Sequence, residues 1–259
     1  MRNIKLTIQY DGTNYHGWQI QQNGISIQQV IEEAIFRITK KESRLTTSGR
    51  TDAGVHALSQ VANFKTSSML DTNKFQKGLN SILPKDIVIL DAQEVPLDFH
   101  AQISAKKKLY RYDIYNSPFA DAFSFKFSKL IPYFLNVSSM KIASQYFLGT
   151  HDFSAFRSSS CEARTTVRTI YKIDLSQQFL GNNKNSTNKL SFTPCRITIE
   201  VEGNGFLKNM VRNIVGTLIE VGREKLVPED IKKILTSRDR KNAGPTAASH
   251  GLFLVKVFY

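Results

Sequence analysis

Cysteine is scarce in this 259-residue sequence, which contains only Cys161 and Cys195 and has no Cys-x-x-Cys element. Structural zinc sites usually draw on closely spaced cysteines, and disulfide scaffolds need a dense set of them. Two widely separated cysteines therefore argue against both and fit a protein that works in a reducing compartment.

Long apolar runs are also missing. No stretch approaches the roughly 20 apolar residues that a membrane-spanning helix requires. The N-terminus enters an alternating strand pattern at residues 4–8, without the apolar segment of a signal peptide. These features predict a soluble, cytoplasmic protein.

Acidic residues are few relative to basic ones: 22 Asp and Glu stand against 35 Lys and Arg, giving a net charge of +13. Such an excess predicts a polyanionic partner. One basic group alone could be a solvated face, but several recur along this chain. We favour a nucleic acid over an anionic membrane, because the sequence lacks a long amphipathic anchor. The basic groups are Lys106–Lys108 with Arg111, Arg157 with Arg164 and Arg168, and Lys232, Lys233, Arg238, Arg240 and Lys241.

Apolar periodicity in the first hundred residues alternates between strand and helix patterns. Residues 4–10 alternate apolar and polar side chains, as a half-buried strand does. Ser26 is a candidate N-cap for a helix with one apolar face, and a second helix predicted for 72–83 must stop at Pro84. Further strands are predicted at 58–65 and 87–95. The order strand, helix, strand, helix, strand is that of a split β-α-β unit.

The second half repeats this element order loosely, without a residue-level repeat. Strands are predicted at 108–116, 166–175, 190–202 and 252–258, and helices at 137–148, at 206–221 and from Pro228 onward. The polar stretch 181–188 is predicted to be a mobile surface loop.

The element order predicts an α+β fold with two domains, 1–105 and 106–259. We expect two ferredoxin- or RRM-like split β-α-β halves that form a continuous, mainly antiparallel sheet with helices on one face. The open face of such a sheet, in a basic protein, suggests a basic cleft that receives nucleic acid.

The decapeptide 48–57, Ser-Gly-Arg-Thr-Asp-Ala-Gly-Val-His-Ala, places Asp52 in a short loop between Gly49 and Gly54. Glycines permit unusual backbone torsions and let another molecule approach the main chain closely. An aspartate in such a loop can act as nucleophile, base or metal ligand, and the nearby Arg50 would favour its ionised form. The alternative is an Asx-turn, in which Asp52 only bonds its own backbone.

Seven separated motifs, in a fixed order over nearly the whole chain, give a specific resemblance. They are Tyr10-Asp11-Gly12-Thr13 with Gly17-Trp18-Gln19, Gly49-Arg50-Thr51-Asp52-Ala53-Gly54-Val55-His56, Asp98-Phe99-His100-Ala101, Tyr110-Arg111-Tyr112, His151-Asp152-Phe153, Gly205-Phe206-Leu207 with Met210-Val211-Arg212, and Ala243-Gly244-Pro245-Thr246-Ala247. With these motifs the chain resembles the TruA family of tRNA pseudouridine synthases. The stretch 181–188 carries no family pattern.

The resemblance implies an isomerase that breaks the N1–C1′ bond of a uridine, rotates the uracil and rejoins it through C5. It implies tRNA as partner, with uridines 38, 39 and 40 of the anticodon stem-loop as targets, rather than DNA or a membrane. It also implies a homodimer and a reaction that needs no metal, redox centre or nucleotide cofactor. Two rivals are a non-catalytic RNA-binding or chaperone protein on the same fold and a paralogue with a different RNA target.

The resemblance also assigns roles to four residues. Asp52 matches the catalytic aspartate, as nucleophile or base. Arg50 matches an arginine that fills the base stack when the target uridine leaves it, with a surface phosphate clamp as the alternative. Tyr110 matches a tyrosine that packs against the uracil, although Tyr110, Tyr112 and Ile114 also alternate like ordinary sheet packing.

Arg212 is the fourth residue, and it matches the arginine that pairs with the catalytic carboxylate. Its position at the edge of an apolar helical stripe would by itself predict a side chain that extends to solvent. The remaining aromatic and histidine residues of the motifs are as readily explained by structural roles, and we leave them out of the catalytic set. They are Trp18, Phe99, His56, His100 and His151.

Overall fold

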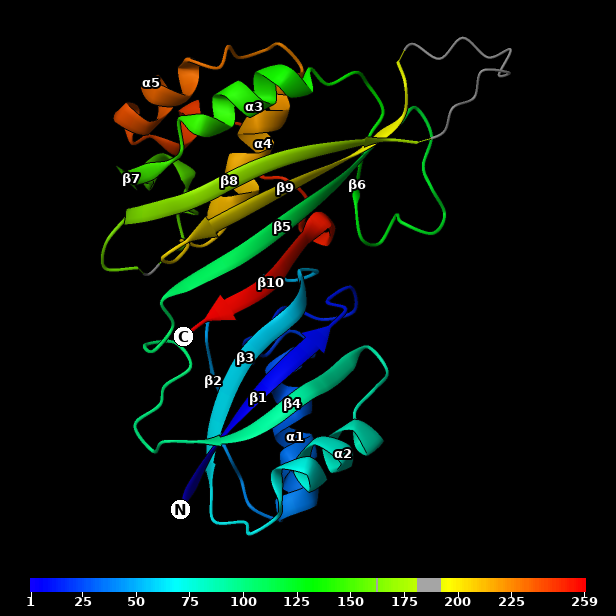
Figure 1. The fold of residues 1–259 in the computed structure, drawn as a ribbon, viewed down its shortest axis with the longest axis vertical. Coiled ribbons are helices and arrows are strands. Elements are labelled where there is room, and N and C mark those ends of the chain that lie inside the picture. Colours follow the sequence, from blue (N-terminus) through cyan, green and yellow to red (C-terminus); the bar gives the residue numbers. More distant parts are fainter. Residues whose placement is uncertain (162, 181–191) are drawn as a thin grey trace. The chain divides into compact units, whose positions relative to one another are not determined.

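A computed structural model describes residues 1–161, 163–180 and 192–259 of the chain (Figure 1). These residues form two compact units, Met1–Lys108 with Phe253–Tyr259 and Leu109–Leu252. Both contain helices and mainly antiparallel strands, which confirms the α+β class. The predicted loop at 181–188 lies outside the described residues.

The sheet of the first unit has the order β4-β1-β3-β10. Strand β1 pairs antiparallel with β3 on one side and β4 on the other, and β2 pairs with β3. Strand β10 pairs in parallel with the start of β3, with Phe253 opposite His56. The strands are β1 (Arg2–Tyr10), β2 (Thr46–Thr47), β3 (His56–Thr66), β4 (Ile87–Val95) and β10 (Leu252–Phe258).

Two helices pack on this sheet, α1 (Ile27–Thr39) and α2 (Thr72–Ile82), and they lie on the same face of it in Figure 1. The Ser26 side chain accepts a hydrogen bond from the Gln29 N–H at 3.2 Å, which confirms it as the N-cap of α1. Alternate residues of β1 are fully buried; these are Ile4, Leu6 and Ile8.

The second unit has a sheet of order β5-β9-β8-β7, with β6 parallel to the end of β5. Strands β8 and β9 form a long antiparallel pair with a register shift between Ile170 and Lys172. The strands are β5 (Lys107–Asn116), β6 (Lys129–Ile131), β7 (Gly149–Asp152), β8 (Val167–Phe179) and β9 (Cys195–Gly203).

In the described part of the second unit, two α-helices begin later than the sequence suggested, whereas the helix predicted from residue 137 begins at that residue. The α-helices are α3 (Val137–Gln145), α4 (Met210–Gly222) and α5 (Asp230–Ser237), and the 3₁₀ turns are η1 (Ser154–Phe156), η2 (Arg240–Asn242) and η3 (Ser249–Gly251). Helix α4 was predicted from Phe206 but starts at Met210, because Asn209 takes a left-handed conformation with φ 63°. Pro228 precedes α5 by two residues rather than occupying its first position.

None of the helices formed by the described residues combines the length and apolar character that a membrane span needs.

Candidate active site

The loop that carries Asp52 ends in a tight turn in which the Val55 N–H donates to the Asp52 carbonyl oxygen at 3.1 Å. Gly54 has a φ of +74°, a left-handed conformation that favours glycine. Asp52 is half-buried and Arg50 is exposed. The turn therefore fixes the backbone around a carboxylate that stays accessible.

The first sequence motif packs directly on this loop. A Cβ on residue Gly12 would lie 2.0 Å from the Val55 carbonyl oxygen, and one on Gly17 would lie 2.6 Å from the Thr51 carbonyl oxygen. The backbone N–H of Trp18 donates to the same Thr51 carbonyl oxygen at 3.0 Å. Two motifs that are far apart in the sequence thus form one structure, and their glycines permit backbone-to-backbone contact.

Buried side chains form hydrogen bonds that hold the loop in place. The hydroxyls of Tyr10 and Thr51 lie 2.7 Å apart, and burial raises the pKa of Tyr10 to about 12, so that its hydroxyl is neutral at physiological pH. Fully buried Gln60 donates from Nε2 to the Gly49 carbonyl oxygen at 2.9 Å and accepts a hydrogen bond from the Ser48 hydroxyl. The loop is therefore anchored on both sides of Arg50.

In the second unit, Tyr110 is a buried residue of β5 whose ring meets the Phe206 ring edge to face, with centroids 5.1 Å apart. Phe206 lies in the segment between β9 and α4, four residues before the helix begins. This contact explains the position of the Tyr110 ring; its contact with substrate stays a prediction.

Arg212 lies in the first turn of α4 and is half-buried. Its Nε donates to the Ala247 carbonyl oxygen at 2.7 Å, and its Nη1 donates to Asn209 Oδ1 at 3.2 Å. The protein therefore fixes the orientation of the guanidinium. The position of Arg212 at the edge of an apolar stripe would by itself have predicted a side chain that extends to solvent.

The last motif, 243–247, supports Arg212 by packing on α4. A Cβ on Gly216 would lie 1.7 Å from the Pro245 carbonyl oxygen, so only glycine fits there. Buried Asn213 accepts from Thr246 Oγ1 at 2.7 Å and from Arg240 Nη2 at 3.1 Å. Sequence reasoning missed Asn213, whose signal is a polar residue inside the apolar stripe of the helix.

Comparison with known proteins shows the family to which a chain with the Asp52 loop and with Tyr110 and Arg212 belongs. The sequence profile described as tRNA pseudouridine synthase matches residues 6–103 and 143–259. The chain belongs to the tRNA pseudouridine synthase family. Members of this family are isomerases that act in tRNA processing, and the resemblance found in the seven motifs is confirmed.

Full-length relatives agree with this membership. A protein of Acetivibrio thermocellus named tRNA pseudouridine synthase A is 49% identical over 259 residues, which cover 100% of both chains. Proteins of the same name from Thermoanaerobacter sp. (strain X514) and Caldicellulosiruptor bescii are 45% and 49% identical, again over 100% of both chains.

The three histidines of the motifs each make contacts within the protein that give them a structural role. His56 is buried, accepts a hydrogen bond from the Gly12 N–H on Nδ1 at 3.1 Å, and stacks on Phe253. His100 Nδ1 accepts from two backbone amides that follow it, and His151 Nε2 lies 2.7 Å from the Leu148 carbonyl oxygen. These contacts give each histidine a structural role, and the exclusion of the three from the catalytic set stays a prediction.

Asp152, in the same motif as His151, also has a structural role. Its Oδ1 accepts hydrogen bonds from the Ser154 N–H at 3.0 Å and the Ser154 hydroxyl at 2.6 Å, and its Oδ2 lies 3.2 Å from Arg238 Nε. Burial alone would raise the pKa of this carboxyl, but the bonds from Ser154 and Thr166 and the charge of Arg238 lower it below its ordinary value.

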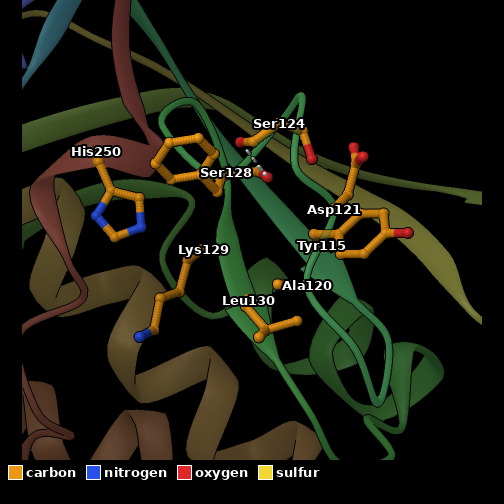
Figure 2. A pocket seen from close by; sticks show the side chains of 9 residues that line it. Tyr115, Ala120, Asp121, Ser124, Ser128, Lys129, Leu130 and His250 are labelled. Atoms are coloured by element: carbon orange, nitrogen blue, oxygen red, sulfur yellow. Dashed lines mark hydrogen bonds between the residues drawn. The ribbon is translucent and has the colours of Figure 1, made fainter.

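A cavity of about 90 Å³ opens in the second unit (Figure 2). Drug-sized ligands usually occupy pockets of roughly 300 Å³ or more, so this cavity is too small to hold one. The residues that line it do not include any of the four predicted site residues. They are Tyr115, Ala120, Asp121, Ser124, Phe125, Ser128, Lys129, Leu130 and His250.

Proposed function

We propose that this chain converts uridine to pseudouridine at positions 38, 39 and 40 of the tRNA anticodon stem-loop, with Asp52 as nucleophile or base. Membership of the family supports the reaction. The observation that carries the residue assignment is the anchored loop, which presents an accessible carboxylate on a backbone held by Tyr10, Gly12 and Gln60.

The reaction is an isomerisation, so its atoms balance without a co-reactant. The N1–C1′ bond breaks, a C5–C1′ bond forms, the C5 proton is lost and N1 gains a proton. Asp52 is the proposed residue for either attack on the substrate or removal of a proton. A carboxylate that must act in one geometry benefits from a loop that is already ordered before substrate binds.

Three further residues are proposed to bind the substrate. Exposed Arg50 would occupy the stack vacated by the uridine, an exchange that offsets part of the few kcal/mol needed to extrude a base. Tyr110 would pack against the uracil, and Arg212 would stabilise the ionised carboxylate of Asp52.

The proposal extends to the assembly and its surroundings. A net charge of +13 supports binding to the phosphates of tRNA through a basic cleft on two split β-α-β halves. By family resemblance we also propose a homodimer that acts on tRNA in the cytoplasm without a metal or other cofactor.

Tritium release from tRNA that carries 5-³H-uridine tests the reaction, because forming the C5–C1′ bond expels the hydrogen on C5. We expect turnover by the natural protein and none by Asp52→Asn, with tRNA binding largely retained. An active Asp52→Asn would overturn the mechanism, and binding by the natural protein without tritium release would favour a non-catalytic RNA-binding protein.

Mapping of the product tests the target positions. Transcripts in which only one of uridines 38, 39 and 40 is present should each be modified at that uridine. Modification elsewhere, or at one of the three only, would favour the paralogue with a different target.

A further inference from the structure

We propose that Lys108 and Gly49 are a matched pair of positioning residues that fix the entry of the Asp52 loop. This inference rests on the proposed role of Asp52. Lys108 contacts the loop backbone and Gly49 belongs to it, and the proposal assigns neither residue a contact with the uridine.

A short hydrogen bond joins Lys108 to the entry of the loop. Lys108 Nζ donates to the Ser48 carbonyl oxygen at 2.6 Å, in a partly buried setting. Hydrogen bonds from a charged donor are shorter and stronger than those between neutral groups. Ser48 stands four residues before Asp52, at the point where the chain leaves strand β2 and enters the loop.

Gly49 makes this contact possible. A Cβ on residue 49 would lie 2.9 Å from Lys108 Nζ and 3.8 Å from its Cε. Gly49, unlike Gly54, is not among the residues with a left-handed φ, so its backbone conformation is open to other residues. Glycine at this position therefore leaves space for the ammonium group.

The other contacts at the loop entry leave a specific task to Lys108. Gln60 Nε2 binds the next carbonyl oxygen, that of Gly49, at 2.9 Å, and the Ser48 N–H donates to the Val61 carbonyl oxygen at 2.8 Å. The Ser48 carbonyl oxygen lies between these two groups along the backbone and accepts the bond from the Lys108 ammonium. Together the three bonds fix successive peptide planes before Arg50.

The expected consequence is on the chemical step. A misplacement of about 1 Å can cost roughly a hundredfold in rate, so a loosened loop should slow isomerisation while tRNA still binds. A lysine that only contacted a phosphate would behave differently, because its loss would weaken binding and lower the salt dependence of the affinity.

Lys108→Met removes the ammonium and keeps the length of the side chain. We expect the single-turnover rate of tritium release at saturating tRNA to fall roughly tenfold to a hundredfold. The dissociation constant for tRNA should change by less than about threefold, and its salt slope should be unchanged. Lys85→Met, which removes the same charge from an exposed position in the first unit, is the control and should keep the natural rate.

Gly49→Ala tests the pair from the other side. Its methyl group should displace the flexible end of Lys108 at little cost in thermal stability and slow the single turnover as Lys108→Met does. The double variant should be no slower than either single one, because both changes remove the same contact. Losses that multiply in the double variant would overturn the pairing.

Asp52→Asn, assayed in parallel, separates the two proposals. If Asp52→Asn is inactive and Lys108→Met keeps the natural single-turnover rate, the positioning role is refuted and the proposed function stands. If Asp52→Asn is active, the proposed function fails. A Lys108→Met variant that loses tRNA affinity but not rate would also refute positioning, in favour of a phosphate contact.

Discussion

The hydroxyl of Tyr10 lies 2.7 Å from Thr51 Oγ1, inside the core of the first unit and one residue before Asp52. Strand β1 ends at Tyr10, so this bond joins the end of a central strand to the loop that carries the carboxylate. The two hydroxyls share one buried hydrogen bond, and removal of either hydroxyl breaks it.

We therefore expect Tyr10→Phe and Thr51→Val each to lower the free energy of unfolding by about 1–2 kcal/mol. The double variant should lose less than the sum of the two, because each single change already removes the one hydrogen bond that the two hydroxyls share. Urea denaturation of the four proteins measures this coupling. Strictly additive losses would show that the two hydroxyls do not depend on each other.

Elements with local signals could be predicted from the sequence. The first strand follows from alternation of apolar residues, α1 follows from Ser26 and one apolar face, and α2 ends just before Pro84. In each case the residues that decide the structure lie within a few positions of one another. The four site residues were recognised from motifs, and their roles stay predictions.

Contacts between distant segments could not be predicted in this way. The parallel pairing of Phe253 with His56 and the approach of Gly12 to Val55 depend on tertiary structure, which leaves no periodic signal in the sequence. The predicted start of α4 was wrong because Phe206 and Leu207 are apolar and fit the helical stripe. Only the left-handed backbone of Asn209 shows that the helix begins after them.

Gly216 offers a test of how the 243–247 segment is held on α4. Alanine usually stabilises a helix relative to glycine by about 1 kcal/mol. Here a Cβ would lie 1.7 Å from the Pro245 carbonyl oxygen, a backbone atom that cannot move alone. We expect Gly216→Ala to be destabilising by about 1–3 kcal/mol in urea denaturation, as overpacked cores are.

The control for this change is Gly78→Ala in α2. There the nearest atom to the new Cβ is the flexible Cδ1 of Ile38, at 3.1 Å. This variant should be neutral or slightly more stable than the natural protein, by up to about 1 kcal/mol. Equal effects of the two substitutions would contradict the close approach of Pro245.

The free energy of unfolding should depend on pH in the acid range because of Asp152. Its pKa in the folded protein lies below the ordinary value of about 3.9, because the bonds from Ser154 and Thr166 and the charge of Arg238 outweigh burial. A carboxyl with a depressed pKa contributes stability that is fully present above its unfolded pKa. That contribution is lost as the pH falls through the folded pKa.

Asp152→Ala should therefore lower the free energy of unfolding by about 1 kcal/mol at neutral pH, a typical net value for lost hydrogen bonds. The difference from the natural protein should shrink as the pH falls below about 4. Asp152→Asn keeps an acceptor oxygen but cannot titrate, so its stability relative to Asp152→Ala should not change over the same pH range. Chemical denaturation across that range measures both, and a constant difference between Asp152→Ala and the natural protein would be evidence against the charged contact.

Arg212 allows a test of geometry at constant charge. Its guanidinium donates through Nε to the Ala247 carbonyl oxygen and through Nη1 to Asn209 Oδ1, and a lysine ammonium cannot reproduce a planar fork with separate donors. Arg212→Lys should lower the single-turnover rate of tritium release at least about tenfold, the equivalent of about 1.4 kcal/mol in the barrier. The matched control, Arg44→Lys, changes an exposed arginine in the same way and should keep the natural rate. A natural rate for Arg212→Lys would show that position 212 contributes charge alone and that the bonds to Ala247 and Asn209 do not serve the reaction.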